Sequence, residues 1–287
     1  MIATKTRSVA TTSLLCAALF ALPGCALLSR LLGPTPKPKV SVSNVRIAEL
    51  SLTHLDLVFD LTITNPYAVE LPLVNVDFSL ASQARPFLQG QAPLQGTVPI
   101  NGSKTVPVPA RVVFLELLKV LQEVRPGAVV PYHATLGLSV NAPMLGALRL
   151  PLEKDGVIPV PTAPNVSIPS VTWKSVSLAG ATGLLKMRVS NPNAFAFDVA
   201  GLDYDIKLGS FGLAKGGLVN AASLVPGGAQ DIGINVSVST AQAGMAIVQL
   251  LQGRGSAYSL GGALTIGTPF GPLRIPLAVT GQVPFLR

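Results

Sequence analysis

An internal repeat constrains the fold of this chain more than any other feature of its sequence. Asn65-Pro66 recurs as Asn191-Pro192, 126 positions further along the chain. The segment LRLPL at residues 148–152 recurs as LRIPL at residues 273–277, 125 positions further along. Because nearly one offset holds over this whole length, the sequence predicts two copies of a single domain.

The repeat also sets the domain boundaries that we expect. The first copy spans residues 40–160 and the second spans residues 165–287. The Pro-rich stretch PVPTAP at residues 159–164 joins them. Residues 1–24 and 25–39 precede the repeat and belong to neither copy.

Alternating side chains predict the strands of each copy. One run in the first copy has an apolar side chain at every second position: Leu55, Leu57, Phe59, Leu61 and Ile63. This alternation indicates a strand with one buried face. Leu185, Met187 and Val189 keep the same phase 126 residues later, and a slip of one residue would reverse the faces. We predict further strands at residues 74–80, 97–108, 135–140 and 148–152, and at residues 202–208, 231–238, 263–266 and 273–279.

Each copy also contains one helical pattern. Apolar residues have the spacing i, i+3, i+4, i+7 at Phe114, Leu117, Leu118 and Leu121, and again at Ala243, Ala246, Ile247 and Leu250. The 27 glycines and 25 prolines favour short strands joined by tight turns. The sequence therefore predicts mainly β domains, each with one short α-helix before its last strands.

The first 25 residues predict an exported, lipid-anchored protein. Lys5 and Arg7 form a short basic region, and an apolar run too short to span a bilayer follows at residues 9–22. The run ends in LPGC, whose last residue is Cys25, and this resembles the lipobox of bacterial lipoproteins. We predict a signal peptide at residues 1–24, cleavage before Cys25 and lipidation of its thiol. The alternatives are an ordinary signal peptide cleaved near residues 18–21 and an uncleaved N-terminal anchor.

Lipidation would place the mature protein in the cell envelope. Residues 25–39 form a tether, because the three prolines in SRLLGPTPKPK disfavour both helix and strand pairing. Cys16 lies in the segment that is removed, so the mature chain has no pair of thiols for a disulfide. Ala26 is not the aspartate that resembles an inner-membrane retention signal, which favours the outer membrane facing the periplasm.

Composition limits the partners that such a chain can have. Removal of residues 1–24 takes away Lys5 and Arg7, which lowers the formal net charge from +8 to +6. The basic residues are scattered, so we expect no nucleic-acid partner, although weak attraction to anionic lipid headgroups remains possible. With 49% hydrophobic and 12% charged residues, the chain should fold rather than resemble the disordered, hydrophilic stress proteins.

No residues have the spacing of a catalytic, metal or cofactor site. His54 and His133 are the two histidines of the chain, and neither has a partner at metal-ligand spacing. His54 and Asp56 share one strand face, which could form a weak metal or acid–base pair. Neither a Gly-x-Ser-x-Gly elbow nor a phosphate loop is present. The sequence therefore predicts that the protein is not an enzyme and has no cofactor.

The repeated motifs resemble those of late-embryogenesis-abundant type 2 proteins, also called WHy domains for water stress and hypersensitive response. In each copy the alternating strand runs into Asn191-Pro192-Asn193 or Asn65-Pro66-Tyr67, followed by a strand with Asp203 or Asp77 and then the single helix. The resemblance implies tandem antiparallel β-sandwiches similar to fibronectin type III modules. It also implies protection against desiccation, cold and other stress.

The motif residues have an intelligible role without a ligand. An asparagine side chain can bond nearby backbone amides in an Asx turn, and proline fixes φ where the strand ends. We therefore interpret the motif residues as structural: Asn65, Pro66, Asp77, Asn191, Pro192, Asn193 and Asp203.

Three functions fit these observations. We predict first a non-enzymatic envelope lipoprotein that protects partially unfolded proteins or membrane through weak contacts. The second is a structural or assembly module of an envelope complex, and the third is a lipid-binding protein. Phe195, Phe197 and Phe270 stand in expected loops, where grouped aromatic side chains could contact clients or lipid.

Overall fold

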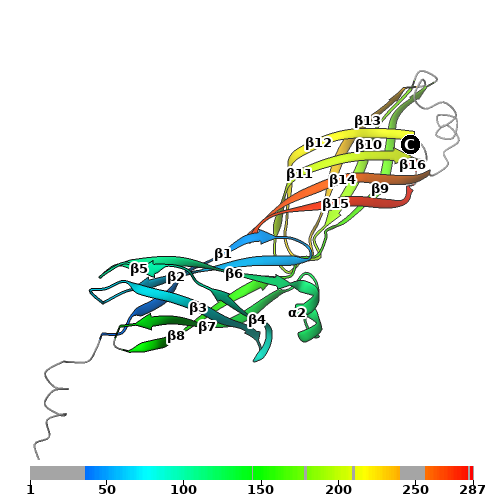
Figure 1. The fold of residues 1–287 in the computed structure, drawn as a ribbon. Helices are drawn as coiled ribbons and strands as arrows, with labels where there is room; N and C mark the ends of the chain where they lie inside the picture. Colours follow the sequence, from blue (N-terminus) through cyan, green and yellow to red (C-terminus); the bar gives the residue numbers. More distant parts are fainter. Residues whose placement is uncertain are drawn as a thin grey trace, which may run out of the picture. The chain divides into compact units, whose positions relative to one another are not determined.

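Two antiparallel β-sandwiches in tandem make up the described part of the protein. The computed structural model describes residues 36–143, 145–177, 180–208, 211–239, 256–283 and 285–286. Strands dominate in both halves, and one short helix lies in the first (Figure 1). The predicted fold class, mainly β with tandem sandwiches, is confirmed.

The first sandwich consists of a three-stranded and a five-stranded sheet. The orders are β1-β2-β6 and β4-β3-β7-β8, and the short β5 pairs with the start of β3. The strands are β1 (Lys39–Leu50), β2 (His54–Thr64), β3 (Leu71–Ser82), β4 (Arg85–Pro93), β5 (Thr97–Val98), β6 (Ser103–Val113), β7 (Val129–Ala142) and β8 (Gly146–Pro159). Their apolar faces enclose one core, which includes Phe59, Leu80 and Leu138, each 0% exposed.

The second sandwich repeats this topology. Its sheets have the orders β13-β10-β9-β16 and β12-β11-β14-β15. The strands are β9 (Asn165–Ser177), β10 (Gly180–Ser190), β11 (Phe197–Leu208), β12 (Phe211–Leu224), β13 (Ala229–Ser239), β14 (Ser256–Thr268), β15 (Gly271–Val283) and β16 (Phe285–Leu286). Strands β9, β10 and β13 correspond to β1, β2 and β6, while β16 adds a short parallel strand beside β9. Its separate core includes Leu185, Met187 and Leu264.

Burial confirms the predicted register of the alternating strands. On β2 the five alternating apolar side chains are at most 2% exposed, whereas Asp56, Asp60 and Thr62 between them are partly exposed. On β10 the alternating residues Leu185, Met187 and Val189 are 0% exposed. The same face of the equivalent strand is therefore buried in both copies.

One strand prediction was wrong. Residues 97–108 do not form one strand, because β5 ends at Val98 and β6 begins only at Ser103. A tight turn separates them: the amide of Gly102 donates to the Pro99 carbonyl at 3.1 Å, and Asn101 has φ +49°. An alternating pattern cannot reveal such a turn, because proline and glycine interrupt pairing without changing the phase of the apolar residues.

The helix of the first copy is confirmed, and it is short. Helix α2 (Phe114–Val120) follows β6 directly and lies beside β4 (Figure 1). It buries Phe114 and Leu117, while Glu116 and Lys119 form an exposed ion pair at 2.8 Å. The helix predicted around Ala243–Leu250 lies outside the described residues. Among the described residues, no helix is long and apolar enough to cross a membrane.

A tyrosine and a glycine that recur in both copies lie face to face across paired strands. Tyr132 on β7 is opposite Gly156 on β8, and Tyr258 on β14 is opposite Gly281 on β15. A Cβ atom at either glycine would lie 2.5 to 2.8 Å from ring carbons and the hydroxyl oxygen of the tyrosine. Only glycine leaves room for the ring, so packing explains why both residues stand at equivalent places in the repeat.

Candidate functional site

The Asn-Pro turn of the first copy is held by a single buried amide. Asn65 is 1% exposed, and its Oδ1 accepts the N–H of Tyr67 at 2.9 Å, which forms an Asx turn. Its Nδ2 donates to the carbonyls of Val69, Val98 and Pro99 at 2.8 to 3.1 Å. One side chain thereby joins the β2–β3 loop to the turn between β5 and β6. Pro66, between these groups, has no N–H that would need a partner.

The second copy builds the same turn from equivalent atoms. Asn191 is 1% exposed, and its Oδ1 accepts the N–H of Asn193 at 2.9 Å. Its Nδ2 donates to the carbonyls of Phe195, Leu224 and Val225 at 2.9 to 3.2 Å. Every partner lies 126 residues after its counterpart, so the repeat preserves a complete hydrogen-bond set as well as residue types.

Asn193 has a partner that the first copy lacks. Its Oδ1 accepts the N–H of Thr162 at 2.8 Å, and its Nδ2 donates to the Thr162 carbonyl at 3.1 Å. Thr162 lies in the PVPTAP stretch, so this side chain fastens the joining segment to the second Asn-Pro turn. Tyr67 stands at the equivalent position of the first copy, and its side chain has no amide group that could make these two bonds.

The two repeated aspartates lie on a solvent-facing strand surface beside an arginine. Arg149 donates from Nε and Nη2 to both oxygens of Asp77, at 3.1 and 2.5 Å. Arg274 and Asp203 make the equivalent pair, but only one contact is present, at 3.5 Å. Both arginines belong to the repeated LRLPL and LRIPL segments, which is the signal by which these partners could have been found in the sequence.

Removing Arg149 should raise the pKa of Asp77. The hydrogen bond and charge of Arg149 hold that pKa below the ordinary value of 3.8. A lowered pKa in the folded state adds stability above the unfolded pKa, and this is lost as the pH falls through the folded pKa. In Arg149→Gln, a carboxyl titration by NMR should show a higher pKa for Asp77 than in the wild-type protein.

The stability change in this variant should be small. Asp77 is 41% exposed, so solvent screening limits the loss at pH 7 to below about 1 kcal/mol. An unchanged Asp77 pKa in Arg149→Gln would contradict the pairing. Arg274→Gln is the matched control, and it should move the pKa of Asp77 very little.

The structure brings Glu49 to the His54 and Asp56 pair. The Nε2 atom of His54 lies 3.5 Å from a Glu49 oxygen, and the ligand atoms of all three residues are within 4.8 Å of one another. However, Arg111 donates to both oxygens of Asp56 at 2.7 and 2.6 Å and lowers its pKa. The guanidinium therefore already supplies the positive charge that a metal ion would bring.

The other histidine forms an exposed pair. His133 Nδ1 lies 2.7 Å from Asp155 Oδ1, and 47% of the histidine side chain and 84% of the aspartate side chain are exposed. Both residues lie on the paired strands β7 and β8. Both side chains are open to solvent, as in an ordinary surface ion pair.

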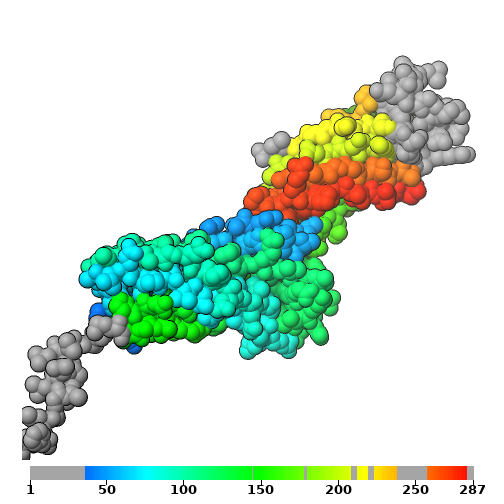
Figure 2. All heavy atoms as spheres, viewed as in Figure 1, coloured from blue at the N-terminus to red at the C-terminus, as the bar shows by residue number. Residues whose placement is uncertain are grey.

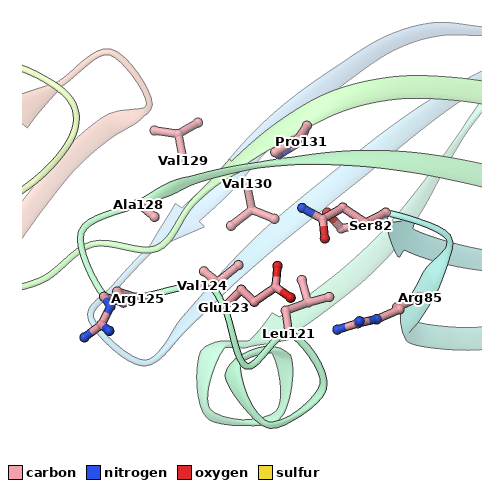
Figure 3. Close-up of a pocket in the computed structure, with 11 residues that line it drawn as sticks. Ser82, Arg85, Leu121, Glu123, Val124, Arg125, Ala128, Val129, Val130 and Pro131 are labelled. Carbon is pink, nitrogen blue, oxygen red and sulfur yellow. The ribbon is translucent and has the colours of Figure 1, made fainter.

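A shallow hollow of about 320 Å³ opens near the end of α2 (Figure 3). Its floor includes Leu121 and Val130, which are at most 3% exposed. Arg85 and Glu123 lie at its rim (Figure 3). Glu123 is the one carboxylate among the residues that line the hollow, so this concavity does not provide a pair of carboxylates for acid–base catalysis.

The predicted loop position is confirmed for Phe195 and Phe270 and was wrong for Phe197, which begins β11. Phe197 belongs to the second core and is 2% exposed, and Phe195 in its loop is 6% exposed. Phe270 is partly exposed and packs edge-on against Phe195, with ring centroids 5.4 Å apart. A sequence pattern cannot separate a loop from a strand start at such a position. Cys25 lies outside the described residues.

Comparisons with known proteins agree with these repeated features. A family model described as late embryogenesis abundant protein (LEA_2) matches residues 60–156 and again residues 186–281. The desiccation protectant protein Lea14 homolog of Glycine max is 27% identical over 127 residues, which cover 44% of this chain and 84% of that protein. The late embryogenesis abundant protein Lea14-A of Gossypium hirsutum is 25% identical over 130 residues, 45% of this chain and 86% of that protein.

Among solved structures, that of AT1g01470 from Arabidopsis thaliana is similar, with 24% sequence identity and a TM-score of 0.38. The match covers 45% of this chain and 85% of that chain. Each of the two curated relatives matches a length of about one copy. Because the family model matches more than half of the chain and matches it twice, the chain belongs to the LEA_2 late embryogenesis abundant family and carries two copies of its domain.

Proposed function

We propose that this protein is a lipid-anchored, non-enzymatic envelope protein that protects other proteins or the membrane during desiccation or cold. The observation that carries the proposal is the doubled LEA_2 domain, because relatives that match a length of about one copy are named as desiccation proteins. The export signal that ends at Cys25 supports the envelope location. Protection would act through weak contacts of the sandwich surfaces with partially unfolded clients.

The geometry of the motif residues supports a protein without catalysis. Asn65 and Asn191 use their side chains on backbone groups, and Asp77 is paired with Arg149. These groups hold the scaffold together, which leaves its surfaces for function. A surface that makes many weak contacts suits clients that differ in sequence.

Protection should be measurable with the mature lipidated protein in mild detergent. Lactate dehydrogenase dried or frozen with it should retain at least about twice the activity that remains with an equal mass of an unrelated β-sandwich protein. Weak, nonspecific contacts should make the effect depend on mass ratio rather than reach a fixed stoichiometry. Equal recovery with the two proteins would refute the protective function.

Lipidation should depend on Cys25 alone. When the full-length protein is produced in a bacterium with labelled palmitate, the wild-type chain should incorporate label and Cys25→Ser should incorporate none. Cys16→Ser is the matched control and should label as the wild type does, because that residue lies in the predicted signal peptide. A wild-type chain without label would exclude the lipid anchor.

A further inference from the structure

The chain enters the first sandwich at the end that carries the Asn-Pro turn. Lys39, the first residue of β1, pairs with Thr64 at the end of β2, and Thr64 pairs with Ser103 at the start of β6. At the same end of the other sheet lie the turn between β7 and β8 and the loop that precedes β5. We call this end of the first sandwich the tether end.

Three large apolar side chains are exposed at the tether end. Val69 in the β2–β3 loop is 50% exposed, Ile100 in the turn before β6 is 53% exposed, and Leu145 in the β7–β8 turn is 41% exposed. In the space-filling view this end is formed by cyan, teal and green segments of the first sandwich (Figure 2). Single exposed apolar residues are ordinary, but three at the tips of separate turns indicate an interaction surface.

Two of these three positions are covered in the second copy, whereas Pro226, the counterpart of Ile100, is exposed. Val69 corresponds to Phe195 by the offset of 126, and Leu145 corresponds to Phe270 by the offset of 125. Phe195 is only 6% exposed and contacts the Phe270 ring, and the neighbouring Ala194 amide donates to the Gly127 carbonyl at 2.7 Å. This end of the domain therefore accepts apolar cover in one copy, while the same positions remain exposed in the other.

The charge around the tether end favours an anionic partner. Lys39 is exposed at the start of β1. Lys104 lies at the start of β6, where its Nζ donates to the Thr97 carbonyl at 3.2 Å. Glu70 is the acidic residue of the β2–β3 loop and accepts a hydrogen bond from Thr97. Basic groups beside exposed apolar side chains match the interface of a bilayer that contains anionic lipid.

We infer that the tether end docks on the surface of an anionic lipid bilayer, with Val69, Ile100 and Leu145 in its interfacial layer. This inference rests on the proposed lipid anchor at Cys25. Lys39 lies only 14 positions after Cys25, a distance of about 43 Å when the chain is extended at ~3.1 Å per residue. A tether of this length gives an effective concentration on the order of millimolar, so weak contacts suffice for docking.

The test places a fluorescent label at the tips of these turns. Lipidated full-length mature protein carrying Ile100→Cys or Leu145→Cys is labelled with NBD and reconstituted into phosphatidylcholine–phosphatidylglycerol vesicles. Lipids with quenchers on their acyl chains should reduce the emission of either label at least about twofold, as interfacial burial of ~5–10 Å requires. Replacing phosphatidylglycerol by phosphatidylcholine should weaken the quenching.

The control label lies on β8, the strand that follows the β7–β8 turn. Val157→Cys is comparably exposed, at 48%, and β8 carries it about 40 Å from residue 145 at ~3.3 Å per residue. It should not be quenched. Equal quenching at residues 100, 145 and 157 in vesicle-bound protein would overturn the inference while leaving the anchor intact. Loss of vesicle binding itself would instead count against the proposed anchor.

A variant with a charged residue in the turn before β6 provides a second test. Ile100→Asp should abolish quenching of the label at residue 145, and circular dichroism should show an unchanged fold because residue 100 is exposed in a turn. If the NBD emission changed with protein concentration in the absence of vesicles, a second copy of the chain would be covering this end. That result would overturn docking on lipid.

Discussion

Replacement of Asn191 by alanine should lower the free energy of unfolding of the second sandwich by about 3 kcal/mol. The substitution removes one acceptor and a donor group that serves three carbonyls, all within 3.2 Å of the side chain. Asn191 is 1% exposed, so water cannot replace these bonds without opening the turn. Buried carbonyls that lose their donor carry their full desolvation cost, and this cost makes the effect large.

The single tryptophan makes this prediction easy to measure. Trp173 is 7% exposed in the core of the second sandwich, so its fluorescence in urea follows the unfolding of that sandwich. Asn191→Ala should move the midpoint to lower urea with an unchanged slope. Asn65→Ala, the matched control, should destabilise the first sandwich and leave the Trp173 transition within about 0.5 kcal/mol. A loss below about 1 kcal/mol in Asn191→Ala would contradict the assigned role.

Phe59→Ala should destabilise the first sandwich by about 4 kcal/mol. Phe59 lies in the middle of β2, is 0% exposed and is among the largest fully buried side chains of the described residues. Its removal takes away the transfer free energy of the ring and leaves a cavity between two sheets that cannot collapse freely. Hydrogen exchange read by mass spectrometry should show the loss in the amides of β2 and β6.

The control for Phe59 lies on the opposite face of the same strand. Thr62 bonds the Thr105 hydroxyl at 3.0 Å on the exposed surface. Thr62→Ala should cost no more than about 0.5 kcal/mol. If the two substitutions had similar effects, the assignment of a buried and an exposed face to β2 would be wrong.

The strands that the sequence predicted are those whose two faces differ in environment. β2 and β10 bury one face completely, so their alternation was readable. β1, β4, β9 and β12 were not predicted. β1 and β4 have at most one buried side chain each and therefore no strong apolar period. These four strands form because their backbones pair with β2, β3, β10 and β11. A Cβ at Gly90 in β4 would also lie 2.5 Å from the Phe78 ring, which explains a glycine inside that strand.

The candidate site was only partly accessible from the sequence. The repeat drew attention to Asn65 and Asn191, but it could not show that each amide reaches carbonyls 33 and 34 residues further along the chain. Glu49 was missed beside His54 because a hairpin between β1 and β2 brings them together. The exposed tips Val69, Ile100 and Leu145 were missed because loop residues have no period that reports exposure.

The sequence by itself determined the doubled domain, the phase of the main strands, the short helix of the first copy and the family. These properties depend on local residue spacing and on a constant repeat offset, and both can be read directly from the sequence. Only the tertiary structure decided which polar groups are satisfied, which carboxylates are neutralised and which apolar side chains remain exposed. Those properties depend on contacts between residues far apart in sequence, and the same apolar position is covered at Phe195 and exposed at Val69.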